Sequence, residues 1–124
     1  MTPEETDLAR QLVALPGWSW SPGMLMLLLA TGHGERFVGE SRTGRPIDRK
    51  GKPAVPRLDD AATAGPLLVM LMAAEPHGVI WWSPTSNGWE WRQLGSAFLS
   101  PADVVEASLG VMAAKALIFL GRCA

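Results

Sequence analysis

Residues 79–94 constrain the fold of this chain more than any other stretch, because they combine two strand-forming runs with a turn. The runs "VIWWS" and "WEWRQL" are rich in β-branched and aromatic residues, and "PTSNG" between them collects residues that favour turns. This pattern predicts a β-hairpin. Four of the six tryptophans of the chain fall within it, so the hairpin must distribute large aromatic side chains between its two faces.

The length of the turn decides how these tryptophans are shared. Side chains alternate along a strand, so Trp89 and Trp91 point to the same face. A two-residue turn places Trp82 with them, whereas a five-residue loop places Trp81 with them. In both cases we expect three tryptophans in the core. The fourth lies on the face that carries Arg92, and we expect it to be a binding residue.

The rest of the chain predicts three helices and a second hairpin. Capping residues, prolines and glycines mark where these elements begin and end. In chain order the signals predict a helix over 3–15, strands over 24–30 and 36–41, a helix with Pro66 in its first turn that closes at 76–78, and a helix over 101–120.

With the hairpin at 79–94, the order of elements is α-β-β-α-β-β-α. This order predicts an α+β fold with a four-stranded, mostly antiparallel sheet and helices packed on one face. A length of 124 residues and a hydrophobic content of 48% fit a single domain, residues 1–124. The last helix is apolar nearly all round, so we expect it to be buried inside the domain or in a homodimer contact.

The segment 43–57 is expected to be an irregular basic loop, since it holds three prolines and two glycines. Residues 35–57 carry a net charge of +4, and the rest of the chain carries −5. These basic side chains could contact the phosphates of a nucleic acid or an acidic protein. The candidates are Arg42, Arg45, Arg49, Lys50 and Lys52.

Residues with catalytic or metal-binding chemistry are few. Asp59 and Asp60 could hold Mg²⁺, but an aspartate before an apolar run is typical of a helix cap. His33 and His77 each lie beside glycine in a turn, and Cys123 has no histidine partner in a recognisable pattern. We therefore expect no enzyme, no cofactor and no metal site. A metal-dependent enzyme that uses Asp59 and Asp60 is an alternative.

The chain is expected to be cytoplasmic. Its single cysteine excludes a disulfide within the chain, and the start "MTPEETDLAR" lacks the basic and apolar regions of a signal peptide. The apolar runs "MLMLLLA" and "LLVMLMAA" are much shorter than the roughly 20 residues of a membrane-spanning helix. We therefore expect no membrane association.

Two blocks of the sequence carry a resemblance to a known group of proteins. "LVALPGWSWSPGML" at 12–25 and "PRLDDAATAGPLL" at 56–68, followed by a C-terminal helix rich in alanine and leucine, resemble short uncharacterised proteins of tailed phages and prophages. The proline at 66 and the apolar "VMLMAA" depart from the more charged helix expected there. The resemblance implies a phage or mobile-element context, and hence a host cytoplasm, but no activity.

These features together predict a small non-enzymatic phage-type accessory or host-modulating protein, which acts by binding a host or phage protein. The expected binding residues are Trp81 or Trp82, Arg92, and the basic residues between Arg42 and Lys52. Nucleic-acid binding through the basic segment 36–57 is the other alternative.

Overall fold

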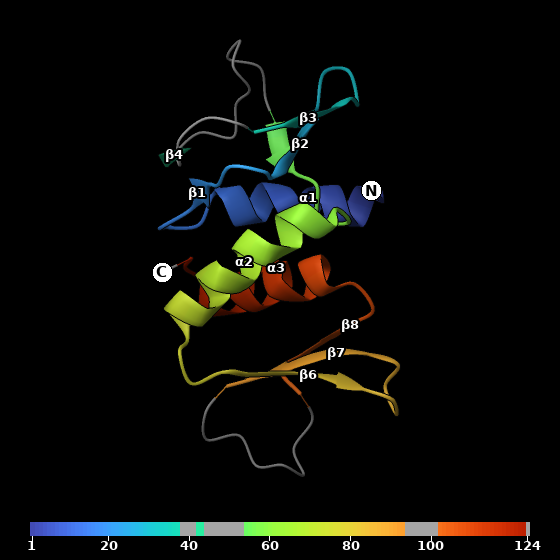
Figure 1. Cartoon of the computed structure of the whole chain (residues 1–124), viewed down its shortest axis with the longest axis vertical. Coiled ribbons are helices and arrows are strands. Elements are labelled where there is room, and N and C mark those ends of the chain that lie inside the picture. The colour runs from blue at the N-terminus through green and yellow to red at the C-terminus, as the bar shows by residue number, and fades with distance from the viewer. Residues whose placement is uncertain (38–41, 44–53, 94–101, 124) are drawn as a thin grey trace.

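The computed structural model describes residues 1–37, 42–43, 54–93 and 102–123 (Figure 1). This part of the chain contains three helices and several short strands. In chain order they are α1 (Pro3–Val13), β1 (Ser19–Trp20), β2 (Leu25–Leu28), β3 (Gly34–Arg36), β4 (Arg42–Thr43), β5 (Ala54–Pro56), α2 (Ala61–Ala74), β6 (Val79–Ser83), β7 (Gly88–Arg92), β8 (Val104–Glu106) and α3 (Leu109–Leu120).

The helices form a central layer between two sheets (Figure 1). One sheet has the order β3-β2-β5 and the other the order β6-β7-β8, while β1 pairs separately with β4. All these pairings are antiparallel. The predicted α+β class is therefore confirmed, but the single four-stranded sheet with helices on one face is wrong. Each hairpin gains a third strand of its own, β5 or β8, and so builds a separate sheet.

The three helices run in the same direction, with their N-termini toward the right of Figure 1. The predicted start of α1 is confirmed, since Thr2 accepts a hydrogen bond from the backbone N–H of Glu5 at 3.1 Å and Pro3 lies in the first turn. α1 buries Leu12 and Val13 and contacts α3 and β5. Its apolar stripe therefore faces the interior, as its sequence predicts.

The first predicted hairpin is confirmed in kind. β2 lies within the predicted strand 24–30, and β3 begins two residues earlier than the predicted partner strand. The third strand, β5, is a correction, because it lies inside the segment 43–57 that the sequence predicts to be irregular. All three of its residues are buried, and Pro56 is tolerated because an outer strand can lack a backbone N–H.

The second helix, α2, begins earlier than predicted. Asp60 caps it by accepting a hydrogen bond from the backbone N–H of Thr63 at 3.0 Å, so the helix starts at Ala61. Pro66 therefore lies in the second turn, where it removes one backbone hydrogen bond at a cost of about 3 kcal/mol. The cap and the burial of one side of the helix offset this cost.

The predicted C-terminal helix is wrong in its first part. Residues 104–106 form β8, and α3 begins only at Leu109 with Ser108 as its cap. Asp103, which lies in the first turn of the predicted helix, instead accepts a hydrogen bond from the backbone N–H of Gln93 at 2.8 Å. Pairing with β7 therefore overrides the local helix signal.

The last helix, α3, lies at the centre of the core. Its residues 110–117 are buried apart from Lys115, and it contacts α1, α2, β7 and β8. Its nearly all-round apolar pattern is thus explained by burial within one chain. Phe119, 56% exposed, is the most exposed apolar residue that it offers to a homodimer contact. Among the described residues, no helix is long and apolar enough to cross a membrane.

Candidate functional site

The tryptophan hairpin has a turn of four residues, 84–87, which is neither of the two predicted lengths. Its paired positions run from Val79 opposite Arg92 to Ser83 opposite Gly88. Asn87 takes a left-handed backbone with φ of 51°, a conformation that asparagine tolerates better than most residues. The hairpin itself is therefore confirmed, and its register is a finding of the structure.

This register places Trp82, Trp89 and Trp91 on one face, and Trp81 on the other face with Glu90. The grouping is the one expected from the shorter turn. Trp91 is fully buried, and its ring meets that of Phe119 from α3 edge-on with centroids 5.9 Å apart. The face with three tryptophans is therefore the one that meets the helix layer.

The expectation of three core tryptophans and one exposed tryptophan is wrong. Trp91 is buried and Trp89 is half-buried, but Trp82 is 44% exposed and Trp81 is 47% exposed. Trp82 packs edge-on against Trp89 with ring centroids 5.5 Å apart. Trp81 and Trp82 both lie on the outer strand β6, whereas Trp89 and Trp91 lie on the central strand β7.

Strand β6 is an open edge among the described residues. It pairs with β7 along one side, and no described strand pairs with its other side. Its five residues carry no charge, and no proline interrupts them. Outer strands of natural proteins usually carry a charge, a proline or a bulge, because an unpaired row of N–H and C=O groups is a template for a further strand.

The outer face of this sheet, on the side away from α3, mixes apolar and charged residues. Trp81 lies opposite Glu90, and Glu90 lies opposite Val105, so the three form one row across the sheet. Glu90 is only 6% exposed, whereas Val105 is 42% exposed and Val79 in the next row is 53% exposed. The predicted binding residue Arg92 lies on this face and is half-buried.

The predicted basic site is mostly outside the described residues. Only the backbone of Arg42 is placed, in β4 opposite Trp20. The remaining candidates, Arg45, Arg49, Lys50 and Lys52, lie outside the described part of the chain. The two described arginines at the ends of this segment are already paired with carboxylates. Arg36 contacts Asp60 and Arg57 contacts Asp59, each through two hydrogen bonds.

The carboxylate of Asp60 is the centre of a polar network that links three elements. The backbone N–H of Leu25 in β2 donates to the Thr63 hydroxyl at 2.9 Å, and that hydroxyl donates to Asp60 at 3.0 Å. Arg36 in β3 donates to the same carboxylate at 2.5 and 3.0 Å. The Arg36 hydrogen bond is the main cause that lowers the pKa of Asp60, and the hydrogen bond from Thr63 acts in the same direction.

The other member of the acidic pair is also engaged. Arg57 donates to Asp59 at 2.8 and 3.3 Å, and this hydrogen bonding lowers the pKa of the Asp59 carboxyl. The predicted capping role of the pair is confirmed for Asp60. Among the described residues, no group of three or more histidine, cysteine, aspartate or glutamate side chains could hold a metal ion.

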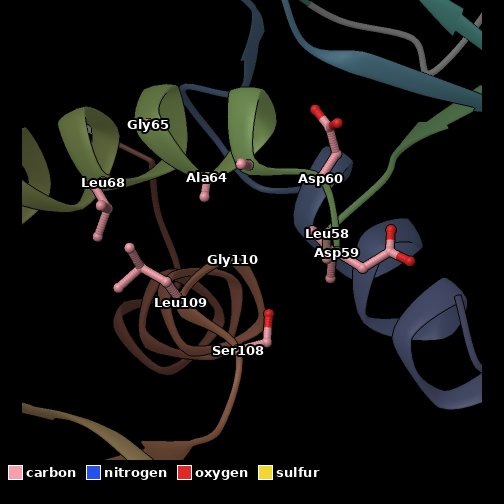
Figure 2. Close-up of a pocket in the computed structure, with 10 residues that line it drawn as sticks. Leu58, Asp59, Asp60, Ala64, Gly65, Leu68, Ser108, Leu109 and Gly110 are labelled. Atoms are coloured by element: carbon pink, nitrogen blue, oxygen red, sulfur yellow. The ribbon is translucent and has the colours of Figure 1, made fainter. Parts of the chain in front are cut away.

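A pocket of about 360 Å³ lies where the N-terminal ends of α2 and α3 meet (Figure 2). Figure 2 shows the carboxylates of Asp59 and Asp60 pointing away from the space between the two helices. The Ser108 hydroxyl caps α3 by accepting from a backbone N–H. The rest of the lining is mainly apolar: Leu58, Ala61, Ala64, Gly65, Leu68, Leu109 and Gly110. No set of acid, base and nucleophile comes together in it.

The remaining reactive side chains lie apart from one another. His33 and His77 are exposed in turns. Cys123 is 2% exposed, and burial raises the pKa of its thiol to about 11. A thiol that stays protonated at neutral pH is a poor nucleophile.

No family model, curated protein or solved structure matches this chain.

The surface holds two features that the sequence does not predict. One is the open edge of β6, which depends on strand order. The other is the exposed apolar side of α2, where Val69 and Met72 are 67% and 63% exposed. The absence of any charge in α2 is a signal that could have pointed to the second.

Proposed function

We propose that this chain is a non-enzymatic protein-binding module, which takes an extended segment of a partner along β6 as a fourth strand. One observation carries the proposal. β6 is an uncharged outer strand of five residues that presents one half-exposed tryptophan on each face. Strand addition uses such an edge, because backbone hydrogen bonds supply affinity and flanking side chains supply specificity.

The side chains that flank this edge define what the added strand must carry. On the outer face it would lie beside Val79 and Trp81, and on the helix-facing side beside Ile80 and Trp82. Aromatic side chains supply large contact areas at low conformational cost. A partner segment with apolar residues on both of its faces, and without a charge in its middle, fits this edge best.

The nature of the partner is supported by sequence alone. The blocks at 12–25 and 56–68 that resemble tailed-phage proteins make a host or phage protein the partner of choice, met in the host cytoplasm. Nucleic-acid binding and metal-dependent catalysis gain no support from the described residues. The nearest arginines are paired, and both aspartates of the pair hold an arginine.

The test uses three baits in bacterial lysates: the wild type, Trp81→Lys and Val69→Lys. A lysine at 81 places a charge in the middle of the open edge and lies opposite Glu90, so a cross-strand ion pair helps to keep the hairpin folded. Val69→Lys is the matched control, because it puts the same charge on an exposed apolar site of α2.

We expect a protein that the wild type and Val69→Lys retain, and that Trp81→Lys binds at least about 30-fold more weakly. Circular dichroism confirms that each bait is folded. N-methylation of alternate amides in the bound segment of the partner should also abolish binding, since these amides would pair with β6. Equal retention by Trp81→Lys, or reproducible absence of any retained protein, would overturn the proposal.

A further inference from the structure

The exposed side of α2 is apolar along its whole length. Every exposed residue of the helix is alanine, glycine, valine or methionine, and no residue of the helix is charged. Val69 and Met72 are the most exposed large hydrophobic side chains in the described part of the chain. Patches of this kind are uncommon on soluble monomers and mark contact surfaces.

The exposed residues form a stripe with the spacing of a helix-packing seam. Ala62, Gly65, Val69 and Met72 follow one another at intervals of three, four and three residues, so they share one face. The two small residues occupy the first half of the stripe, and the two large ones occupy the second half. All four residues are exposed, so this face lies on the side of α2 away from the core. Figure 1 shows α2 crossing in front of α3.

Gly65, at the edge of the pocket beside α3, is not required to be glycine by the packing of this chain. A Cβ atom built on Gly65 meets nothing within 4 Å, and its backbone is helical, so alanine would fit. Glycine in a helix interior is less favourable than alanine. Space left open at such a position allows the close approach of a second helix from outside.

We infer that this face binds the same face of a second copy of the chain, with the two α2 helices antiparallel about a two-fold axis. In that arrangement Ala62 faces Met72 of the second copy, and Gly65 faces Val69. Each small residue then receives a large one, and the relation holds in both directions, as a two-fold contact requires. The proposal goes beyond strand addition at β6 and does not rest on it.

The charges around the helix favour a second copy over other occupants. An antiparallel neighbour brings the N-terminal end of each helix dipole beside the C-terminal end of the other. It also brings Asp60, at the N-cap, level with Ala74 of the second copy. Arg122 donates a hydrogen bond at 2.8 Å to the carbonyl of Ala74, so a basic side chain lies at that end of the helix. Nucleic acid and anionic lipid both require basic residues on the contact face, and α2 has none.

The size of the face sets the strength of the contact. A helix of 14 residues is about 21 Å long, so two such faces bury less than the roughly 1,200 Å² that separates stable from transient interfaces. The dimer should therefore form reversibly. Sedimentation velocity between about 10 µM and 1 mM should show the average mass rising from monomer toward dimer.

Gly65→Ala should stabilise the monomer and weaken the dimer. In dilute solution the monomer should melt roughly 2 to 5 °C higher, because the methyl group meets open space and the unfolded chain loses freedom. The dissociation constant of the dimer should rise about fivefold or more, because the methyl group holds the helices apart. A residue that matters only for folding would not separate the two readouts.

A matched pair of lysine variants locates the contact. Val69→Lys should raise the dissociation constant at least about 30-fold, since it would bury an unpaired charge. Val79→Lys puts the same charge on β6 and should leave self-association unchanged while it weakens partner capture. The two proposals therefore fail separately. A wild type that stays monomeric at about 1 mM would overturn the inference. So would self-association that Val69→Lys leaves intact or that Val79→Lys abolishes.

Discussion

The two three-stranded sheets lie on opposite sides of the helix layer, and their outer strands differ in charge, proline content and exposure (Figure 1). In the first sheet, β3 carries Arg36, which is held by Asp60, and β5 is fully buried and includes Pro56. In the second sheet, β6 has no charge and no proline and exposes two tryptophans. Both outer strands of the first sheet thus carry features that discourage a further strand, whereas β6 carries none of them.

This difference separates the sheet that is tied into the helix layer from the strand that we propose for binding. The first sheet is tied to α2 by a polar network that runs from the backbone of Leu25 through Thr63 to Asp60. The hairpin of the second sheet buries Trp91 against α3, while no described strand pairs with the other side of its outer strand. A chain that binds by strand addition needs this combination of a fixed hairpin and a free edge.

The largest expected effect on stability comes from Gly110, where the start of α3 packs against the segment that follows β5. Gly110 follows β8 and packs on the backbone of Leu58, which follows β5; a Cβ atom at Gly110 would come within 2.1 Å of the Leu58 carbonyl oxygen. We expect Gly110→Ala to lower the free energy of unfolding by about 3 kcal/mol, although alanine is the better helix former.

Chemical denaturation measures this effect, with Gly65→Ala as the matched control in the neighbouring helix. The control should raise the free energy of unfolding by about 0.5 to 1 kcal/mol. If Gly110→Ala were as stable as the wild type, the close packing of α3 on the end of β5 would be disproved.

The second largest effect should come from Thr63→Val, which should destabilise the first sheet and leave the second sheet unchanged. Thr63 is fully buried, and Thr63→Val keeps its shape but leaves the backbone N–H of Leu25 without a partner. We expect a loss of about 1 to 3 kcal/mol in the free energy of unfolding. Hydrogen exchange should quicken in β2 and stay unchanged in β7. Thr63→Ser, which keeps the hydroxyl, is the control, and equal losses in both variants would contradict the proposed hydrogen-bond network.

A smaller effect should appear in acid. The folded-state pKa values of Asp59 and Asp60 are lowered by their arginine partners, so their contribution to stability is present above about pH 4 and is lost as the pH falls further. Asp60→Asn keeps a capping oxygen but removes the charge. Between pH 5 and pH 3 the wild type should lose about 0.5 kcal/mol more than this variant. Identical losses would show that the ion pair does not contribute to stability.

The smallest effect should come from the strand opposite β6. Val105 in β8 is exposed on the outer face, so Val105→Lys should change the free energy of unfolding by less than about 0.5 kcal/mol. It should also leave partner capture unchanged, because it lies on the far edge of the sheet. A loss of capture equal to that of Trp81→Lys would make the whole outer face the binding surface, instead of the β6 edge.

The elements that the sequence predicts well are those that depend on near neighbours. Thr2 caps α1 through a contact three residues away, Asp60 caps α2 in the same way, and the tryptophan hairpin turns within four residues. Such interactions are complete within a few residues, so a local pattern reveals them.

The elements that the sequence misses depend on distant partners. β5 has three residues and no local strand signal, and it exists because it pairs with β2. β8 replaces the first part of a predicted helix because it pairs with β7, and Asp103 is taken by the backbone of Gln93. The exposure of Trp82 follows from the order of strands in its sheet, which no spacing in the sequence encodes.

Hydrogen exchange on the complex with the captured partner tests the open edge most directly. Amides of 79–83 that face away from β7 have no partner strand among the described residues, so they should exchange quickly in the free chain, and an added strand would give them partners. Strand addition predicts at least about tenfold slower exchange within this segment, with β3 and β5 unchanged. Unchanged exchange in 79–83, with protection confined to other elements, would contradict the assignment of β6 as the binding strand.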